Sequence, residues 1–333
     1  MKKSINQILL NKVQEHISSN EKLVTYLMDT LSLGRESAYR RVRDQIPFTI
    51  EEIVKLCDKL NLSIDGIVGR DAKQKTLMNA PKDTFDNPQE AFVEILNIQY
   101  DTMINVYKAQ KKEIIAGLNR MDSSVILGYE YMFKFYYYKW LHQLYQLPSS
   151  FNYSDVIVPE EIITAKNKLI HLYKKIRDTH CTYILDQNMY FDIIKEIQYY
   201  YKRGLISDED LILMKEEFHD IIYNMENIVR NATNNMNNKY LCYISIFTLE
   251  SSCFYISYDD KVCASITPCS LFPMQTTDLE ACKALKRLLD SQKKHSILIT
   301  ESNEYVQAGF FKKQHEYLNM DFKDSNFTFI DEF

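Results

Sequence analysis

The residues with the most distinctive chemistry lie between positions 35 and 43, which hold four arginines and one glutamate. The run reads Arg-Glu-Ser-Ala-Tyr-Arg-Arg-Val-Arg, so four positive charges and one negative charge give a net charge of +3. Arginine donates paired hydrogen bonds to phosphate oxygens or to a guanine edge, and glutamate accepts from cytosine. Charge runs of this kind also occur on solvated surface helices, so the neighbouring segments decide between the two interpretations.

The segments around this run predict short helices joined by tight turns. Leucines recur at four-residue spacing in residues 21–31, which predicts a helix there, and residues 32–34 form a turn. A second helix follows over residues 35–43, and its Ala38 and Val42 can pack against the first. Thr49 and Glu52 stand at the spacing of a capping box before a helix over residues 51–60. Residues 64–68 predict a last short helix.

This order of helices resembles the DNA-binding domain of the phage-repressor (Cro-like) family of helix-turn-helix regulators. The resemblance covers residues 5–69 and rests on Leu31-Ser-Leu-Gly-Arg-Glu-Ser-Ala-Tyr-Arg-Arg-Val and on Phe48-Thr-Ile-Glu-Glu-Ile. It implies that the second helix enters the major groove of DNA. The DNA-binding residues it implies are Gly34 at the N-cap, Arg35, Glu36, Ser37, Tyr39, Arg40, Arg41 and Arg43.

One of these residues departs from the pattern of the family. Arg41 stands where family members often place an apolar side chain. We expect its alkyl stem to pack against the unit while its head reaches a phosphate. At the other end of the chain, Lys293 to Glu304 and Phe310 to Gln314 resemble the end of a bacterial regulator group of similar length.

The balance of charge restricts any nucleic-acid surface to a part of the chain. The 333 residues hold 40 Lys or Arg and 45 Asp or Glu, a net charge of −5. Residues 1–70 hold 11 basic and 9 acidic residues, a net of +2, so the remainder carries −7. This excludes a uniformly basic coat protein and places the basic surface in the first 70 residues.

Several other classes of site lack their signature in this sequence. The seven cysteines form no Cys-x-x-Cys pair, although Cys253, Cys263 and Cys269 lie near one another. No His-Glu-x-x-His or phosphate-loop motif is present. The run at residues 8–10 is too short for a signal peptide, and no stretch is apolar enough to span a membrane. We therefore expect a cytoplasmic protein with reduced cysteines, no catalytic residues, no metal site and no cofactor.

The rest of the chain predicts a mainly α protein with a small α+β domain at its C-terminus. Residues 71–88 are polar and contain two prolines, which predicts a linker. Residues 89–238 predict long helices, including one helix over residues 92–121 and an aromatic helix over residues 129–140. The aromatic helix suits a buried core, a subunit interface or a pocket wall. Residues 239–333 predict strands followed by strand and helix alternation.

The sequence favours a DNA-binding transcriptional regulator with double-stranded DNA as its partner. A single helix-turn-helix reads only a half-site, so we expect a homodimer joined by residues 89–230. Any small-molecule effector is left open. The alternatives are an interaction adaptor, or an enzyme using an acid-base cluster in the tail. That cluster would comprise His295, Glu301 and Glu304, with Ser296 or Ser302 as nucleophile.

Overall fold

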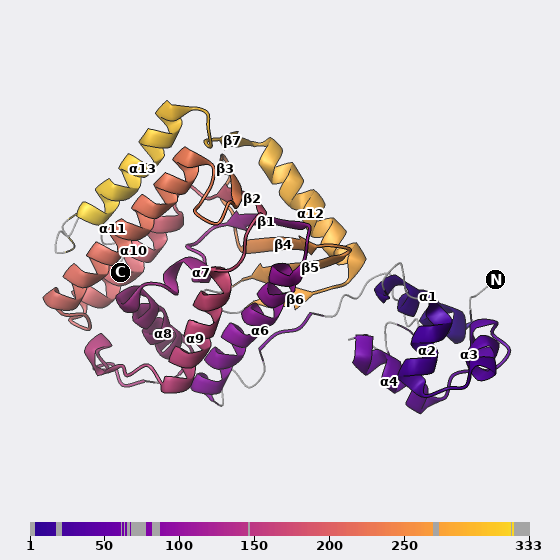
Figure 1. The fold of residues 1–333 in the computed structure, drawn as a ribbon. Coiled ribbons are helices and arrows are strands. Elements are labelled where there is room, and N and C mark those ends of the chain that lie inside the picture. The colour runs from indigo at the N-terminus through magenta and orange to yellow at the C-terminus, as the bar shows by residue number, and fades with distance from the viewer. Residues whose placement is uncertain are drawn as a thin grey trace. The chain divides into compact units, whose positions relative to one another are not determined.

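The computed structural model describes residues 4–17, 22–60, 62, 64, 67, 78–81, 87–145, 147–268, 273–320 and 322. The chain divides into two compact units, Met1–Leu77 and Met78–Phe333, each with its own hydrophobic core (Figure 1). The predicted helix 64–68 and the predicted linker 71–88 lie mostly outside the described residues.

The N-terminal unit is a bundle of short helices. Its helices are α1 (Ile5–His16), α2 (Leu23–Leu31), α3 (Arg35–Val42) and α4 (Ile50–Leu60). Leu9, Leu27, Ala38 and Leu56, one from each helix, are fully buried where the helices meet. The helices predicted over residues 21–31, 35–43 and 51–60 are thus confirmed to within two residues at each end.

The C-terminal unit is built on a seven-stranded mixed sheet with the order β6-β5-β4-β1-β2-β3-β7. Three neighbouring strands, β1 (Lys112–Leu118), β2 (His180–Leu185) and β3 (Lys239–Ser245), are parallel to one another. The flanking pairs are antiparallel. The outer strands are β4 (Ser252–Tyr258), β5 (Lys261–Thr267), β6 (Met274–Thr276) and β7 (Ser296–Leu298).

Helices cover both faces of this sheet (Figure 1). One face carries α12 (Leu279–Lys294), which lies so close to β1 that a side chain at Gly117 would meet Leu289 at 3.2 Å. The opposite face carries the larger core. The helices on that side are α6 (Pro88–Lys108), α7 (Ser123–Ile126), α8 (Glu130–Leu144), α9 (Glu160–Tyr173), α10 (Met189–Lys202), α11 (Asp208–Asn231) and α13 (Glu304–Asn319).

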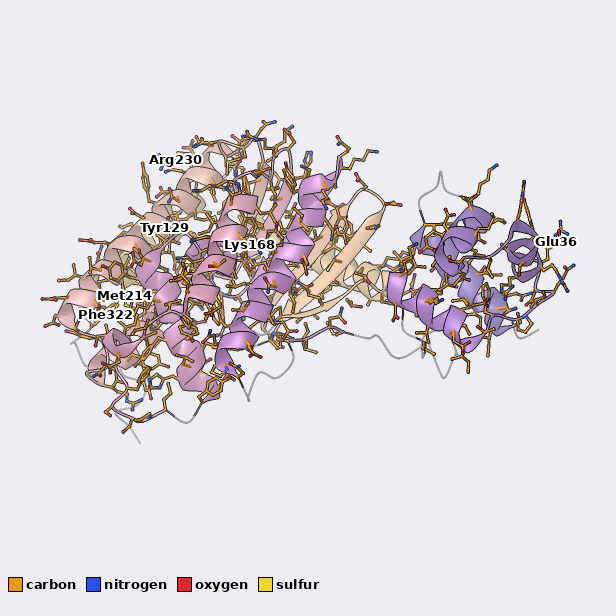
Figure 2. The ribbon with its side chains drawn as sticks, turned by 60° about the horizontal axis from the view of Figure 1, so that its bottom comes forward. Glu36, Tyr129, Lys168, Met214, Arg230 and Phe322 are labelled. Carbon is orange, nitrogen blue, oxygen red and sulfur yellow. The ribbon has the colours of Figure 1, made fainter. Side chains whose placement is uncertain are left out.

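Helix α13 and Phe322, which follows it, pack against α11. Buried Phe322 follows α13, and the Nζ atom of Lys215 in α11 lies 3.9 Å from the centre of its ring (Figure 2). The side-chain amide of Gln198 in α10 donates to the Phe322 carbonyl at 3.4 Å. Two earlier helices are therefore joined to the last described residue of the chain.

The sheet corrects the predicted fold class. A mainly α protein with a small C-terminal α+β domain is wrong, because the seven strands span residues 112–298 and two of the central ones come from the region predicted as long helices. The single helix predicted over residues 92–121 is also wrong. The observed helix, α6, ends at Lys108. Ile114 and Leu118 lie on β1, and their spacing continues the helical period of α6 by coincidence.

Local residues set the ends of α10 and α11, and one further predicted helix of this unit is confirmed. Ser207 caps α11 by accepting from the backbone N–H of Asp210 at 3.0 Å, and Gly204 adopts a left-handed conformation after α10. The aromatic helix over residues 129–140 is α8, and its side chains are buried in the core of the unit. Of the three interpretations of that segment, the structure supports the buried core.

Candidate nucleic-acid interface

The turn between α2 and α3 sets the direction in which α3 leaves the first helix. Ser32 adopts a left-handed conformation with φ of 55°, and the Leu33 N–H donates to the Met28 carbonyl at 3.1 Å. Gly34 is the N-cap of α3, as expected, in an extended conformation. The turn therefore closes α2 and opens α3 within three residues, as the predicted helix-turn-helix requires.

Helix α3 has a polar outer face and a packed inner face. Arg35, Glu36, Tyr39, Arg40 and Arg43 are exposed, and Figure 2 shows Glu36 at the periphery of the unit. Ala38 and Arg41 are buried on the opposite side, and Ser37 is half-buried between the two faces. The helix thus brings the side chains of five of the eight predicted DNA-binding residues to one continuous surface.

A tyrosine lies between two of the exposed arginines. The guanidinium carbons of Arg35 and Arg43 lie 5.8 Å and 5.7 Å from the centre of the Tyr39 ring. These three residues recur every four positions, so they form one row along the helix. Neither arginine, nor Arg40, forms an ion pair in the described part of the chain. Their donors are therefore available to an anionic partner.

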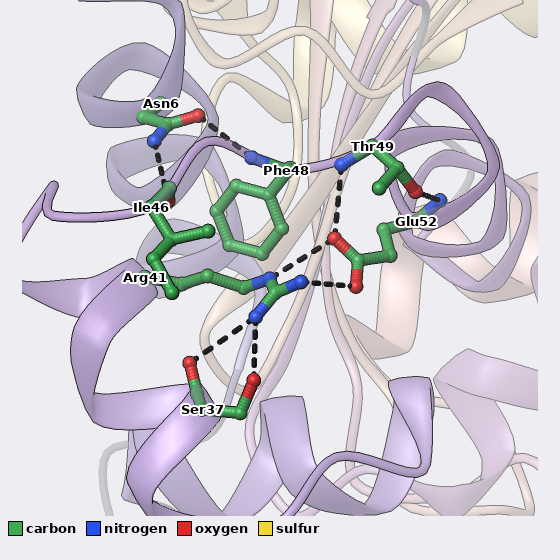
Figure 3. A network of polar contacts seen from close by, with 7 residues as sticks. All are labelled: Asn6, Ser37, Arg41, Ile46, Phe48, Thr49 and Glu52. Atoms are coloured by element: carbon green, nitrogen blue, oxygen red, sulfur yellow. Dashed lines mark hydrogen bonds and ion pairs between the residues drawn. The ribbon is translucent and has the colours of Figure 1, made fainter.

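Arg41 lies inside the unit, where its guanidinium is held by side chains of α3 and α4 (Figure 3). Its Nε donates to Glu52 Oε2 at 3.0 Å and its Nη2 to Glu52 Oε1 at 2.7 Å. Its Nη1 donates to the Ser37 hydroxyl at 2.7 Å and to the Ser37 carbonyl at 3.3 Å. A paired arginine and carboxylate is the strongest arrangement of these groups, because both hydrogen bonds are charge-assisted.

Glu52 also fixes the start of α4. Its Oε2 accepts from the Thr49 N–H at 2.9 Å, and the Thr49 hydroxyl accepts from the Glu52 N–H at 3.2 Å. The predicted capping box is therefore confirmed. Because the same carboxylate also binds Arg41, the cap of α4 and the rotation of α3 are set by one side chain.

A buried amide ties the loop between α3 and α4 to the first helix. Asn6 of α1 donates to the Ile46 carbonyl at 3.1 Å, and its Oδ1 accepts from the Phe48 N–H at 3.1 Å (Figure 3). These bonds, with those of Arg41, join three helices behind the exposed face of α3. The rigid support of that face comes from residues that are not themselves exposed.

The structure changes the expected role of Arg41 and adds residues that sequence reasoning missed. Its guanidinium faces Glu52 and not the outer surface, because the carboxylate satisfies it within the unit. The Ser37 hydroxyl likewise accepts a hydrogen bond from Arg41. Glu52 was identified as a cap but not as the partner of an arginine eleven residues earlier. The signal was present: a cation on an inward position calls for a nearby carboxylate.

The acid-base cluster considered in the tail does not come together. His295, Glu301, Ser302 and Glu304 are exposed, and the half-buried Ser296 donates its hydroxyl to the Gln292 carbonyl at 2.8 Å. Within the described part of the tail, no hydrogen bond or ion pair joins any two of these side chains. An enzymatic site needs such convergence.

The cysteines and acidic residues offer no further site over the described ranges. Burial raises the pKa of Cys181, Cys242 and Cys263 to about 12, so these thiols stay protonated and unreactive. Cys269 lies outside the described residues. Among the residues that the structure describes, no group of three or more His, Cys, Asp or Glu side chains could hold a metal ion, and no helix is long and apolar enough to cross a membrane.

Comparisons with known proteins add no relative to this description. No protein-family model, curated protein or solved structure matches the chain.

Proposed function

We propose that the chain is a cytoplasmic, sequence-specific DNA-binding transcriptional regulator that acts as a homodimer. The observation that carries the proposal is the outer face of α3, on which Arg35, Tyr39, Arg40 and Arg43 are exposed beside Glu36. Arginines on a helix that follows a tight turn are suited to the major groove, where they bind guanine edges and backbone phosphates.

The inner side of α3 supports the proposal independently of charge. A helix that reads base edges must hold a fixed rotation, because each side chain addresses one step of the duplex. The four hydrogen bonds of the Arg41 guanidinium and the capping box of Glu52 provide that rigidity. A merely solvated helix has no need for a buried ion pair behind it.

The homodimer is proposed because one helix-turn-helix reads only a half-site, and two must stand about 34 Å apart on DNA. The aromatic side chains of α8 are buried within one chain, so the contact between chains uses other surfaces. Light scattering of the full chain at micromolar concentration is expected to give twice the chain mass of 39.4 kDa. A particle of the single-chain mass would contradict the dimer.

The experiment that tests the proposal is selection of binding sites from random DNA with the purified full chain. We expect a short consensus with two-fold symmetry, because two identical heads meet one duplex. Recovery of random sequence at low salt would refute specific binding. Failure to retain any DNA at low salt would refute the DNA-binding function and favour an interaction adaptor.

The same selection experiment tests whether Arg35 contacts a base. Arg35→Ala is expected to relax the consensus at one position per half-site, because a bidentate arginine contact to guanine is worth ~1–3 kcal/mol. The matched control is Lys55→Ala, which removes one exposed positive charge from α4 of the same unit. Identical consensus sequences for wild type and Arg35→Ala would remove Arg35 from the base contacts.

Arg43, at the end of α3, is expected to bind the phosphate backbone. Its replacement by alanine should weaken binding to all DNA sequences equally and reduce the slope of log affinity against log salt by ~1. Titrations of wild type and Arg43→Ala at several salt concentrations measure both quantities. If neither the affinity nor the slope changes, this end of α3 does not face the backbone.

A further inference from the structure

A cavity of about 150 Å³ lies in the C-terminal unit between the sheet and helix α6. Ile95 and Met103 of α6 form one wall, and Ile114 of β1 with Phe254 and Ile256 of β4 form the floor. The apolar lining is therefore drawn from three elements that pack around the space without filling it. A cavity of about this size holds one benzene ring.

Polar side chains reach into this apolar space. Ser265 of β5 is only 5% exposed, lines the cavity, and its hydroxyl makes no hydrogen bond with any residue that the structure describes. A hydroxyl that faces such a space without a protein partner can hydrogen-bond to a ligand or to water. Nearby, the Thr102 hydroxyl of α6 lies 3.1 Å from the Ile98 carbonyl and 3.2 Å from Gln275 Oε1, so an amide and a second hydroxyl face the same space.

The charged groups at the rim are occupied by the protein itself. Asp122 accepts from the N–H of Ser124 at 2.9 Å and from its hydroxyl, which caps α7. Arg120 Nη1 lies 3.7 Å from Glu196 Oε1. Burial raises the pKa of the lining tyrosines Tyr173 and Tyr183 far above their usual range, so both remain neutral. The groups left to meet a ligand are therefore uncharged donors and acceptors.

We propose that this cavity is a binding site for a small uncharged ring compound that carries a hydroxyl or amide group. The ring fits between Phe254 and the aliphatic side chains of α6, and its polar group meets the Ser265 hydroxyl and the Gln275 amide. Phenol and benzamide are the simplest members of this class. Such sites combine an apolar enclosure with a few placed polar groups.

The site adjoins the segment that connects the two units. Asn79 and Gln275 exchange backbone hydrogen bonds of 2.7 Å and 2.8 Å, so Asn79 is paired with β6, whose Gln275 lines the cavity. A ligand that competes with Thr102 for the Gln275 side chain therefore acts on the residue to which Asn79 is hydrogen-bonded. Resting on the proposed function, this makes the ligand an effector of DNA binding; the binding site itself does not depend on that function.

The test is saturation-transfer NMR of the full chain with phenol, benzamide and the anion benzoate, without DNA. We expect the two neutral probes to bind with dissociation constants of about 1 mM or below, and benzoate to bind at least about tenfold more weakly. Absence of binding by both neutral probes overturns the site. Equal binding of benzoate overturns the uncharged class.

Two variants test whether the probes bind in the cavity. Ser265→Leu fills the space and is expected to reduce benzamide affinity by at least about tenfold. Ser257→Leu, on the neighbouring strand and the opposite face of the sheet, is the matched control and should bind as wild type. Equal binding by both variants overturns the assignment. If Ser265→Leu fails to fold, Ser265→Ala removes only the hydroxyl and is expected to weaken benzamide about threefold, whereas unchanged affinity overturns the role of Ser265.

The outcome is independent of the DNA experiment. Probe binding that depends on Ser265, in a chain that selects no DNA sequence, supports the ligand site and refutes only the regulator. For a chain that does select DNA, benzamide is expected to change operator affinity in wild type and not in Ser265→Leu. An operator affinity that benzamide leaves unchanged refutes the effector role.

Discussion

Both units of the molecule bury a basic side chain, but they stabilise it in different ways. In the N-terminal unit the Arg41 guanidinium makes four hydrogen bonds, two to Glu52 and two to Ser37. In the C-terminal unit Lys139 of α8 makes one, from Nζ to Glu196 Oε2 at 2.6 Å, and its Nζ lies 4.6 Å from the centre of the Tyr136 ring. The first cation is surrounded by hydrogen-bond acceptors, whereas the second is surrounded mainly by carbon atoms.

The chemistry of the two cations explains why both arrangements are tolerated. Arginine keeps its proton in proteins, so a buried guanidinium needs a full set of acceptors. Lysine can release its proton. Burial lowers the pKa of Lys139, while the charge and hydrogen bond of Glu196 act in the opposite direction. The N-terminal pair therefore fixes geometry, whereas the C-terminal pair can change its charge.

The largest expected effect is on the arginine. Glu52→Gln leaves the Arg41 guanidinium buried without its carboxylate, which is expected to cost about 3 kcal/mol of local stability. Hydrogen exchange of the full chain, measured over residues 23–60, reports this loss. The control is Glu51→Gln, an exposed glutamate of the same helix. Exchange rates that are the same in both variants would show that the pair does not hold α3.

An intermediate effect, which depends on pH, is expected for the lysine. Glu196→Gln should cost about 2 kcal/mol near neutral pH, the value of a charged hydrogen bond. Removing Glu196 lowers the pKa of Lys139 further, so folded Lys139 loses its proton at a lower pH while the unfolded chain keeps it up to about 10.5. In that window the unfolded state binds more protons, so stability rises with pH and the deficit against wild type shrinks.

Urea unfolding at several pH values from neutral to mildly alkaline measures this deficit. Trp140, the single tryptophan of the chain, lies next to Lys139 in the sequence. Its fluorescence therefore reports on the unfolding of this unit. In a Lys139→Met background the same Glu196→Gln change is expected to show no such pH dependence. A deficit that is constant with pH in the presence of Lys139 would mean that the lysine stays charged like the arginine.

The smallest effect is expected where α11 meets α13. The Nδ1 atoms of His219 and His315 lie 3.1 Å apart, and burial, followed by the charge of His219, lowers the pKa of His315. The unfolded state therefore binds a proton first as the pH falls below about 6.5, and folded stability is lost there. His315→Gln should flatten this loss in Trp140-monitored unfolding. His171→Gln, at an exposed position of α9 in the same unit, should not.

The N-terminal unit could be predicted from sequence because its signals are local. The capping box of Thr49 and Glu52 spans four residues, and the leucine spacing of α2 spans nine. The burial of Arg41 could not be predicted from its own position, since it depends on a carboxylate eleven residues away. The cavity was beyond reach altogether, because Ser265 and Thr102 are joined only by the tertiary fold.

The central strands escaped prediction for a related reason. Ile114 and Leu118 continue the spacing of α6, and only the short break at residues 109–111 separates helix from strand. The strand β2 is six residues long, and helices cover both faces of the sheet to which it belongs. It therefore lacks the alternation of apolar and polar residues that marks a half-buried strand. Parallel pairing leaves no mark in the sequence beside the strand, because its partner is far away.

The position of β1 has a consequence for the synthesis of the chain. Ala116 pairs with Tyr183 on one side and with Phe254 on the other, so β1 is complete only after β4 has been made. A ribosome that has produced β1, β2 and β3 holds a sheet with both edges open, because β4 and β7 come later in the chain, while the N-terminal helices already have all their partners. Incomplete products that end before residue 252 therefore carry an edge along which other chains can add as strands, and the last third of the translation protects the middle third from aggregation.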